Sequence, residues 1–268
     1  MANNDAKSPL EVDGDSILTR EQQKQLLQNG HLLSDLLIDY LRTNVVGTVQ
    51  PSNWQRVAWA LLARSRYTLQ TILGIPERFV DKAVLTRTLF EHAVTFAWVA
   101  INPALNLTRW SAWTHEQQKK MFNHLVEVGA FMPNADEIRE SLQRDEVALR
   151  GASPAPDIVT RAREADEHWR KQLPDAPEFV RSYANLFRQY SIYVHPNGGG
   201  LTPFIPELGS DTSNVGEPKI EFVGDPAVDA VGVFAFELMI SAKALGWPQQ
   251  HEVLMRYVHG LKMPENKS

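Results

Sequence analysis

The chain contains no cysteine among its 268 residues. This absence excludes disulfide frameworks, thiolate zinc sites, iron–sulfur clusters and cysteine nucleophiles. No window approaches the roughly 20 uninterrupted apolar residues that a membrane-spanning helix needs. The first residues are polar and acidic, without the basic start and apolar run of a signal peptide. We therefore expect a soluble, cytoplasmic protein that has no membrane partner.

The motifs of several enzyme classes are also missing. The sequence has no His-Glu-x-x-His zinc motif, no Walker phosphate-binding loop and no Gly-x-Gly-x-x-Gly fingerprint. It also lacks the Glu-x-x-His pairs that di-iron helical bundles use. The net charge is −5 and basic residues form no run, so contact with nucleic acid would need a local basic patch. We expect no metal site and no cofactor.

The sequence is rich in apolar residues at helical spacing, with Gly, Pro and capping residues between the periodic segments. It therefore predicts an all-α fold, a multi-helix bundle of about eight or nine helices. A short strand is expected at 219–224. The expected helices cover residues 23–44, 54–73, 77–102, 108–129, 135–150, 157–172, 177–195, 227–246 and 248–261.

Composition predicts a single helical domain over 19–263, between a flexible N-terminal tail at 1–18 and a short tail at 264–268. Residues 134–175 are dense in charges of alternating sign, which is typical of a solvated helix face, so we expect a charged helical excursion there. We expect a Gly- and Pro-rich loop at residues 196–217. A loop of this length is unusual in a compact domain and is a candidate for function.

Arg87 and Glu91 lie one turn apart on the helix predicted at 77–102, whose other positions are mostly apolar. A helix of that kind is expected to be surrounded by other helices, which places both charges in low dielectric. One interpretation is a structural ion pair that fixes helix register. The other is a polar pocket between helices, where Arg87 holds an anion and Glu91 orients it.

The stretch "RQYSIYVHPNGGG", residues 188–200, ends a second amphipathic helix. Ser191 and His195 are four residues apart and are therefore neighbours on the helix surface. His195 lies in the last turn, where the negative end of the helix dipole favours a protonated imidazole. One interpretation is a favourable C-terminal cation before a Pro/Gly stop. The other is a reactive Ser/His pair beside a glycine loop that can approach a ligand closely.

The two stretches together resemble a bacterial family of helical proteins of unknown function. The resemblance covers residues 55–200 and is carried by Arg-x-x-x-Glu with a following Trp and Pro in "RTLFEHAVTFAWVAINP", and by Tyr-Ser-x-x-x-His in "YSIYVHP". That family is in turn similar to HEPN domains, helical bundles that include metal-independent ribonucleases and toxins. HEPN nucleases carry Arg, four to six residues and then His, a spacing that Arg87–His92 and Arg188–His195 both fit. After the arginine they usually place Asn or Asp, whereas this sequence has Thr88 or Gln189.

The resemblance implies a HEPN-like core, a metal-independent ribonuclease or toxin-type effector, an RNA or nucleotide partner and a homodimer. The candidate catalytic residues are Arg87, Glu91, Ser191 and His195, and the candidate substrate-binding residues are Arg188, Tyr190 and His92. The alternative is a non-catalytic module. Such a module would bind a protein through the charged excursion or the 196–217 loop, or would bind a small anionic ligand such as a nucleotide.

Overall fold

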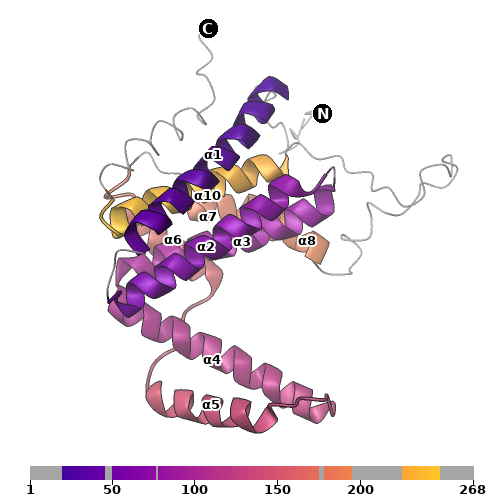
Figure 1. Cartoon of the computed structure of the whole chain (residues 1–268), viewed down its shortest axis with the longest axis vertical. Coiled ribbons are helices and arrows are strands. Elements are labelled where there is room, and N and C mark those ends of the chain that lie inside the picture. Colours follow the sequence, from indigo (N-terminus) through magenta and orange to yellow (C-terminus); the bar gives the residue numbers. More distant parts are fainter. Residues whose placement is uncertain (1–19, 46–49, 77, 175–177, 195–224, 248–268) are drawn as a thin grey trace, which may run out of the picture.

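The computed structural model describes residues 20–45, 50–76, 78–174, 178–194 and 225–247. Every regular element within these ranges is helical (Figure 1), which confirms the predicted all-α, multi-helix architecture. The expected strand, the 196–217 loop, the last helix and both tails lie outside the described residues. The elements are α1 (Arg20–Val45), α2 (Asn53–Gly74), α3 (Phe79–Ile101), α4 (Pro103–Glu127), α5 (Ala135–Ala148), α6 (Ile158–Trp169), α7 (Phe179–Ser182), the π-helix η2 (Tyr183–Gln189), α8 (Tyr190–Val194) and α10 (Pro226–Ala244).

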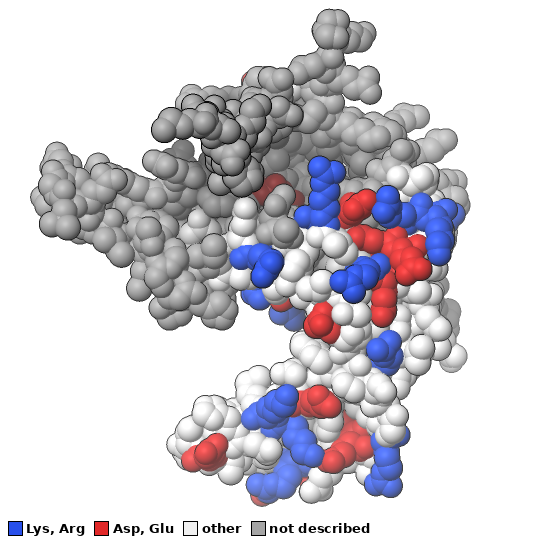
Figure 2. All heavy atoms as spheres, turned by 180° about the vertical axis from the view of Figure 1, so that it is seen from behind, with Lys and Arg blue, Asp and Glu red and all other residues white. Residues whose placement is uncertain are grey.

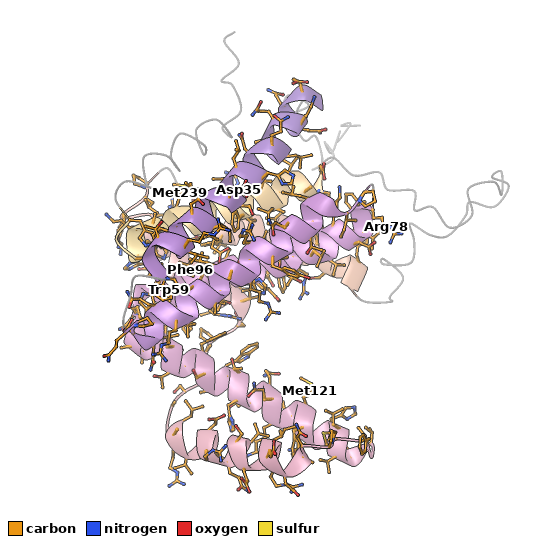
Figure 3. All side chains as sticks on the ribbon, viewed as in Figure 1. Asp35, Trp59, Arg78, Phe96, Met121 and Met239 are labelled. Atoms are coloured by element: carbon orange, nitrogen blue, oxygen red, sulfur yellow. The ribbon has the colours of Figure 1, made fainter. Side chains whose placement is uncertain are left out.

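Helix α3 lies at the centre of the helical body and contacts α2, α4, α6, α8 and α10. Its last three turns are buried almost continuously, and α10 is buried along most of its length. A helix that is apolar around most of its circumference is stable only when other helices cover it. Phe96 on α3 and Met239 on α10 lie within the body, whereas Met121 lies exposed on α4 (Figure 3).

Capping residues set the helix ends around α3. Ser52 begins α2 through a capping box, in which its hydroxyl oxygen accepts the Gln55 backbone N–H at 3.2 Å. Asn102 ends α3, as expected from the Asn-Pro sequence. It also begins α4, because its side-chain oxygen accepts the Leu105 N–H and Pro103 needs no donor at the first helical position. Helix α4 therefore starts five residues earlier than the expected start at Thr108.

Gly30 allows α1 to lie close against α10. A β-carbon at this position would come within 2.6 Å of a Val231 methyl group on α10. The sequence alone marks Gly30 only as a weak point within a helix, since glycine is a poor helix former. In the fold, the missing side chain at Gly30 permits the close approach of α1 and α10.

Helices α4 and α5 form a hairpin, residues 103–148, that projects from the body (Figure 1). No side chain of α5 is buried. Basic and acidic side chains are interspersed over the hairpin and the adjoining face of the body, without a large patch of one sign (Figure 2). The side chains of α5 are therefore in contact with solvent.

Helix α6 differs from that expectation, because it packs into the body against α3. Ala162, Ala165 and Trp169 are buried, and the Trp169 indole N–H donates to the carbonyl oxygen of Ala97 at 2.9 Å. The prediction of one exposed excursion at 134–175 therefore describes α5 but not α6. Alanines leave only a thin apolar stripe in the sequence, yet their small size lets two helices approach closely.

The segment 178–194 is helical as predicted, but its middle is a π-helix rather than an α-helix. Asp166 of α6 holds the start of this segment. Its two carboxylate oxygens accept the backbone N–H groups of Phe179 and Val180, each at 2.8 Å. Two free N–H groups of a helix N-terminus are thereby satisfied. Because π-helical turns are frequent at functional sites, we expect η2 to belong to a functional site.

Glu237 on α10 is a fully buried carboxyl group, and burial raises its pKa from 4.5 to about 8. The Ser65 hydroxyl donates to one carboxyl oxygen at 2.9 Å, while the other oxygen has no partner among the described residues. The folded state therefore binds a proton that the unfolded state releases above pH 4.5. The stabilisation from this proton is complete below pH 4.5 and is lost as the pH rises through about 8.

We predict that Glu237→Gln removes this pH dependence, because glutamine keeps an acceptor for Ser65 but cannot ionise. The parent should lose about 1.4 kcal/mol of unfolding free energy per pH unit relative to the variant between pH 5 and pH 8. Urea unfolding at a series of pH values measures the difference. Parallel curves for the two proteins would show that Glu237 does not titrate in this window.

Candidate functional site

Arg87 is held by three groups from two distant parts of the chain. Its Nε donates to the Ser191 hydroxyl oxygen at 2.8 Å, and its Nη2 donates to Glu91 at 3.3 Å. Its guanidinium carbon lies 4.3 Å from the centroid of the Phe187 ring. We call these four residues, Arg87, Glu91, Phe187 and Ser191, the Arg87 cluster. The side chain of Arg87 is 19% exposed and that of Glu91 is 39% exposed, so solvent reaches the cluster.

The π-helix and the turn that follows it place Phe187 and Ser191 against α3. The Ser191 hydroxyl donates to the backbone carbonyl oxygen of Phe187, four residues earlier. Its remaining lone pairs can then accept the Arg87 Nε–H. The serine is thereby fixed as an acceptor, and the guanidinium is held between an aromatic ring and a carboxylate.

The structure brings together Arg87, Glu91 and Ser191. Arg188 is exposed and forms no hydrogen bond or ion pair within the described parts of the chain. His92 lines a neighbouring cavity on another side of α3. His195 lies outside the described residues.

Tyr190 is buried and connects α8 to α10. Its hydroxyl donates to Asp229 at 2.5 Å. Burial raises the pKa of the Asp229 carboxyl, and burial together with the Asp229 charge raises the pKa of the Tyr190 phenol. The contact of Tyr190, a predicted substrate-binding residue, with Asp229 supports the position of α8.

We predict that Tyr190→Phe lowers the unfolding free energy by about 1–3 kcal/mol, because a buried carboxyl group loses its donor. Tyr193→Phe is a matched control, since the Tyr193 hydroxyl forms no hydrogen bond within the described residues. Chemical denaturation of both variants measures the effect. Equal losses in the two would contradict a specific role for the Tyr190–Asp229 bond.

A cavity of about 440 Å³ lies between α2, α3, α4 and α6, beside the Arg87 cluster. We call it the Arg161 cavity. Glu91 belongs to both the cluster and the cavity, and so connects them. The lining residues are Val57, Ala60, Leu61, Arg64, Glu91, His92, Thr95, Trp110, Trp113 and Arg161.

Arg161 is 7% exposed, which is unusual for an arginine without a carboxylate partner. Its Nη1 donates to the Thr95 hydroxyl oxygen at 2.7 Å, and its guanidinium carbon lies 5.6 Å from the centroid of a Trp113 ring. Its Nε is buried without a partner, and no ion pair reaches it from the described residues. Burial lowers the pKa of the guanidinium, while the charges of Glu91 and Asp157 raise it.

Sequence reasoning missed Arg161 because it lies in a charge-dense segment. A local signal exists nevertheless. Ile158, Ala162, Ala165 and Trp169 form an apolar stripe at helical spacing, and Arg161 lies on the same side of the helix, one turn before Ala165. Arg161 is therefore a charged residue on a buried apolar stripe, which the sequence pattern alone could have indicated.

His92 is a neutral acceptor or donor in the wall of the Arg161 cavity. Burial, together with the charge of Arg64, lowers its pKa to about 4. The imidazole is therefore uncharged at neutral pH. Its Nδ1 is buried and has no hydrogen-bond partner among the described residues.

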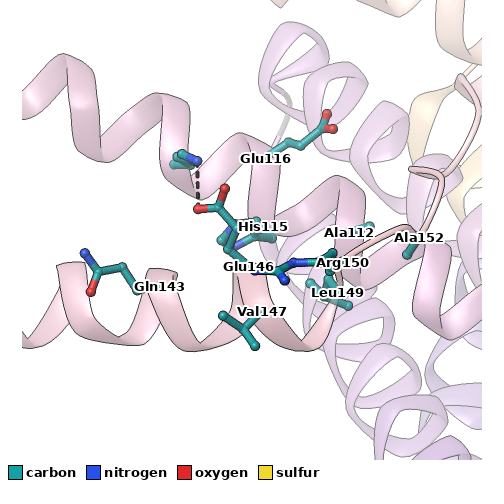
Figure 4. Close-up of a pocket in the computed structure, with 10 residues that line it drawn as sticks. Ala112, His115, Glu116, Gln143, Glu146, Val147, Leu149, Arg150 and Ala152 are labelled. Atoms are coloured by element: carbon teal, nitrogen blue, oxygen red, sulfur yellow. Dashed lines mark hydrogen bonds and ion pairs between the residues drawn. The ribbon is translucent and has the colours of Figure 1, made fainter.

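A second cavity, of about 530 Å³, lies between α4 and α5 on the hairpin (Figure 4). His115 is buried at its wall, and neither ring nitrogen has a partner within the described chain. Lys119 bridges the two helices by a 2.9 Å ion pair with Glu146, whose pKa it lowers. The lining carries two cations, Lys119 and Arg150, and two carboxylates, Glu116 and Glu146, so its charges are balanced.

The described residues fit neither the geometry of a metal site nor that of a membrane-spanning helix. No three His, Asp or Glu side chains gather there in a way that could hold a metal ion. None of the described helices is long and apolar enough to cross a membrane.

Residues 57–212 match a family of unknown function, DUF5677. The chain belongs to this family. The matched region is more than half of the chain and includes Arg87, Arg161 and Ser191, so both the Arg87 cluster and the Arg161 cavity lie within it. The resemblance to a helical family of unknown function is thereby confirmed. No curated protein and no solved structure matched the chain.

Proposed function

We propose that the chain is a HEPN-like, metal-independent ribonuclease in which the Arg87 cluster binds the phosphate group that is cleaved. The hydrogen bond from Arg87 to Ser191 supports this proposal most directly, because it joins two motifs 104 residues apart in the sequence. The cluster carries a partly exposed cation, Arg87, and a partly exposed carboxylate, Glu91. These are the groups that a metal-independent phosphodiester cleavage can use.

In the proposed reaction a base takes the proton of the RNA 2′-hydroxyl, and the oxygen attacks the adjacent phosphorus. The bond from phosphorus to the 5′-oxygen breaks, an acid protonates that oxygen, and a 2′,3′-cyclic phosphate remains. Arg87 stabilises the negative charge that develops on the phosphoryl oxygens. Ser191 accepts the Arg87 Nε–H and, together with Glu91, orients the guanidinium.

Proton transfer in this proposal is assigned to His195. It follows Ser191 by four residues, about one helical turn, in the sequence. His92 is less suited to act as an acid, because its pKa of about 4 leaves it unprotonated at neutral pH. His92 instead contributes to the wall of the neighbouring cavity.

We predict that the purified protein cleaves single-stranded RNA in the presence of EDTA and leaves a cyclic phosphate end. Arg87→Gln and His195→Ala should each lower the rate by about 100-fold or more, and Ser191→Ala by less. Arg181→Gln, which changes an exposed arginine of α7, is the control and should keep the parent rate. A gel assay with labelled RNA measures all four variants.

A DNA strand of the same sequence should resist cleavage, since it lacks the attacking hydroxyl group. Thermal unfolding of each variant shows whether a lost rate reflects a lost fold. Parent protein without activity, or His195→Ala with the parent rate, would contradict the proposed mechanism.

The second candidate function is a non-catalytic module that associates through the tip of the hairpin. Phe131 is 92% exposed and Val128 is 60% exposed, and both lie in the connection between α4 and α5. Exposed apolar side chains that gather at one place mark interaction surfaces. We propose a second copy of the chain as the partner, because a helix such as α5, which buries no side chain, gains stability from a further contact.

We predict that Phe131→Ser weakens self-association of the parent protein. Leu105→Ser is the matched control, because Leu105 is an exposed apolar residue at the opposite end of α4. Sedimentation velocity over a series of concentrations measures both. A parent protein that remains monomeric throughout the series would contradict association through the hairpin.

A further inference from the structure

The Arg161 cavity has a chemistry of its own that the ribonuclease proposal does not use. We propose that it binds a small monocarboxylate with an apolar or aromatic body. The proposal is independent of any activity at the Arg87 cluster, although the two sites share Glu91.

Arg161 is buried without a counter-ion among the described residues. A buried charge is costly unless it is paired and hydrogen-bonded. Among the described residues, Arg161 has one hydrogen bond, to the neutral Thr95 hydroxyl, and no ion pair. A negatively charged ligand in the adjoining cavity would supply the counter-charge and the hydrogen-bond acceptors that Arg161 lacks among the described residues.

The guanidinium of Arg161 also has N–H donors that no described residue uses. Because Nη1 of Arg161 is used by Thr95, the edge formed by Nε and Nη2 is left without a partner in the described chain. A guanidinium edge of this kind donates two parallel hydrogen bonds to the two oxygens of one carboxylate. His92 lines the same cavity, and its Nδ1 is buried without a hydrogen-bond partner among the described residues.

The charge of the residues that line the cavity favours a ligand with one negative charge. Arg64 and Arg161 contribute two positive charges and Glu91 one negative charge, while His92 is neutral at pH 7. The lining therefore has a net charge of +1. A monoanion balances it, whereas a phosphate dianion would leave an excess negative charge near Glu91.

The size of the cavity and the polarity of its walls fit a small ligand with an apolar body. The volume of about 440 Å³ lies within the usual range for small-molecule sites. Val57, Leu61, Trp110 and Trp113 supply apolar and aromatic surface for the body of the ligand. A single ring with a carboxylate side chain matches this combination better than a ribose, whose hydroxyl groups would meet apolar walls.

Three probes that each carry one phenyl ring and differ in the polar group separate these contributions. Phenylacetate carries one negative charge, phenylacetamide none, and phenyl phosphate up to two. Isothermal titration calorimetry of the full chain at pH 7.5 should show saturable binding of phenylacetate. Phenylacetamide and phenyl phosphate should each bind at least about tenfold more weakly.

Two variants connect the binding to this cavity. Arg161→Gln should weaken phenylacetate binding by about 10- to 100-fold. Arg163→Gln, which changes an exposed arginine on the same helix, should leave it unchanged. Ala60→Trp is a second route if Arg161→Gln does not fold, because Ala60 is exposed on α2 and a large ring there would obstruct the cavity while Arg161 itself is kept.

Three results would overturn the inference. They are absence of saturable phenylacetate binding, undiminished binding by folded Arg161→Gln or Ala60→Trp, and tighter binding of phenyl phosphate than of phenylacetate. The last result would assign the cavity to phosphate esters instead. RNA cleavage by the same preparations is a separate readout, so failure of either proposal can be recognised without the other.

Discussion

The arrangement of the other helices depends on a few polar side chains of α3, which face different neighbours. This helix is buried over most of its surface, yet Thr86, Arg87 and Thr95 carry polar groups that need partners. Three later segments provide them: the Pro226 carbonyl of α10, the Ser191 hydroxyl of α8 and the Arg161 guanidinium of α6. A buried polar group without a partner is costly, so these bonds select one packing among those that apolar contacts alone would allow.

Helix α6 supports both candidate sites at once. Its first turn carries Arg161, which faces the cavity, and its third turn carries Asp166, which holds the start of α7. From α7 the chain continues through the π-helix directly to Ser191. A displacement of α6 along α3 would therefore move the guanidinium in one site and the serine in the other. The hydrogen bond from the Trp98 indole to Glu164, on the exposed side of α6, opposes such a displacement.

Local periodicity and capping residues predicted the helices well, because both act over a few residues. Ser52 and the Asn102–Pro103 pair are examples. The sequence also singled out Arg87 and Ser191, although not that they touch. The buried position of α6 was missed because its contacts depend on alanines, which carry a weak apolar signal. Arg161 was missed because it lies in a charge-dense segment, and its contact with Thr95, 66 residues away, cannot be read from local periodicity. The π-helix leaves no periodic signal that separates it from an α-helix.

Glu91 gives the two proposed sites a common electrostatic element. It pairs with Arg87 at 3.3 Å, and its charge also raises the pKa of Arg161 across the cavity. A carboxylate bound to Arg161 would neutralise that second attraction and repel Glu91 toward Arg87. The ion pair with Arg87 would then strengthen, and a phosphate group would compete for Arg87 less well. Two anions that share one carboxylate in this way oppose each other's binding, and the effect is reciprocal because it is a coupling free energy.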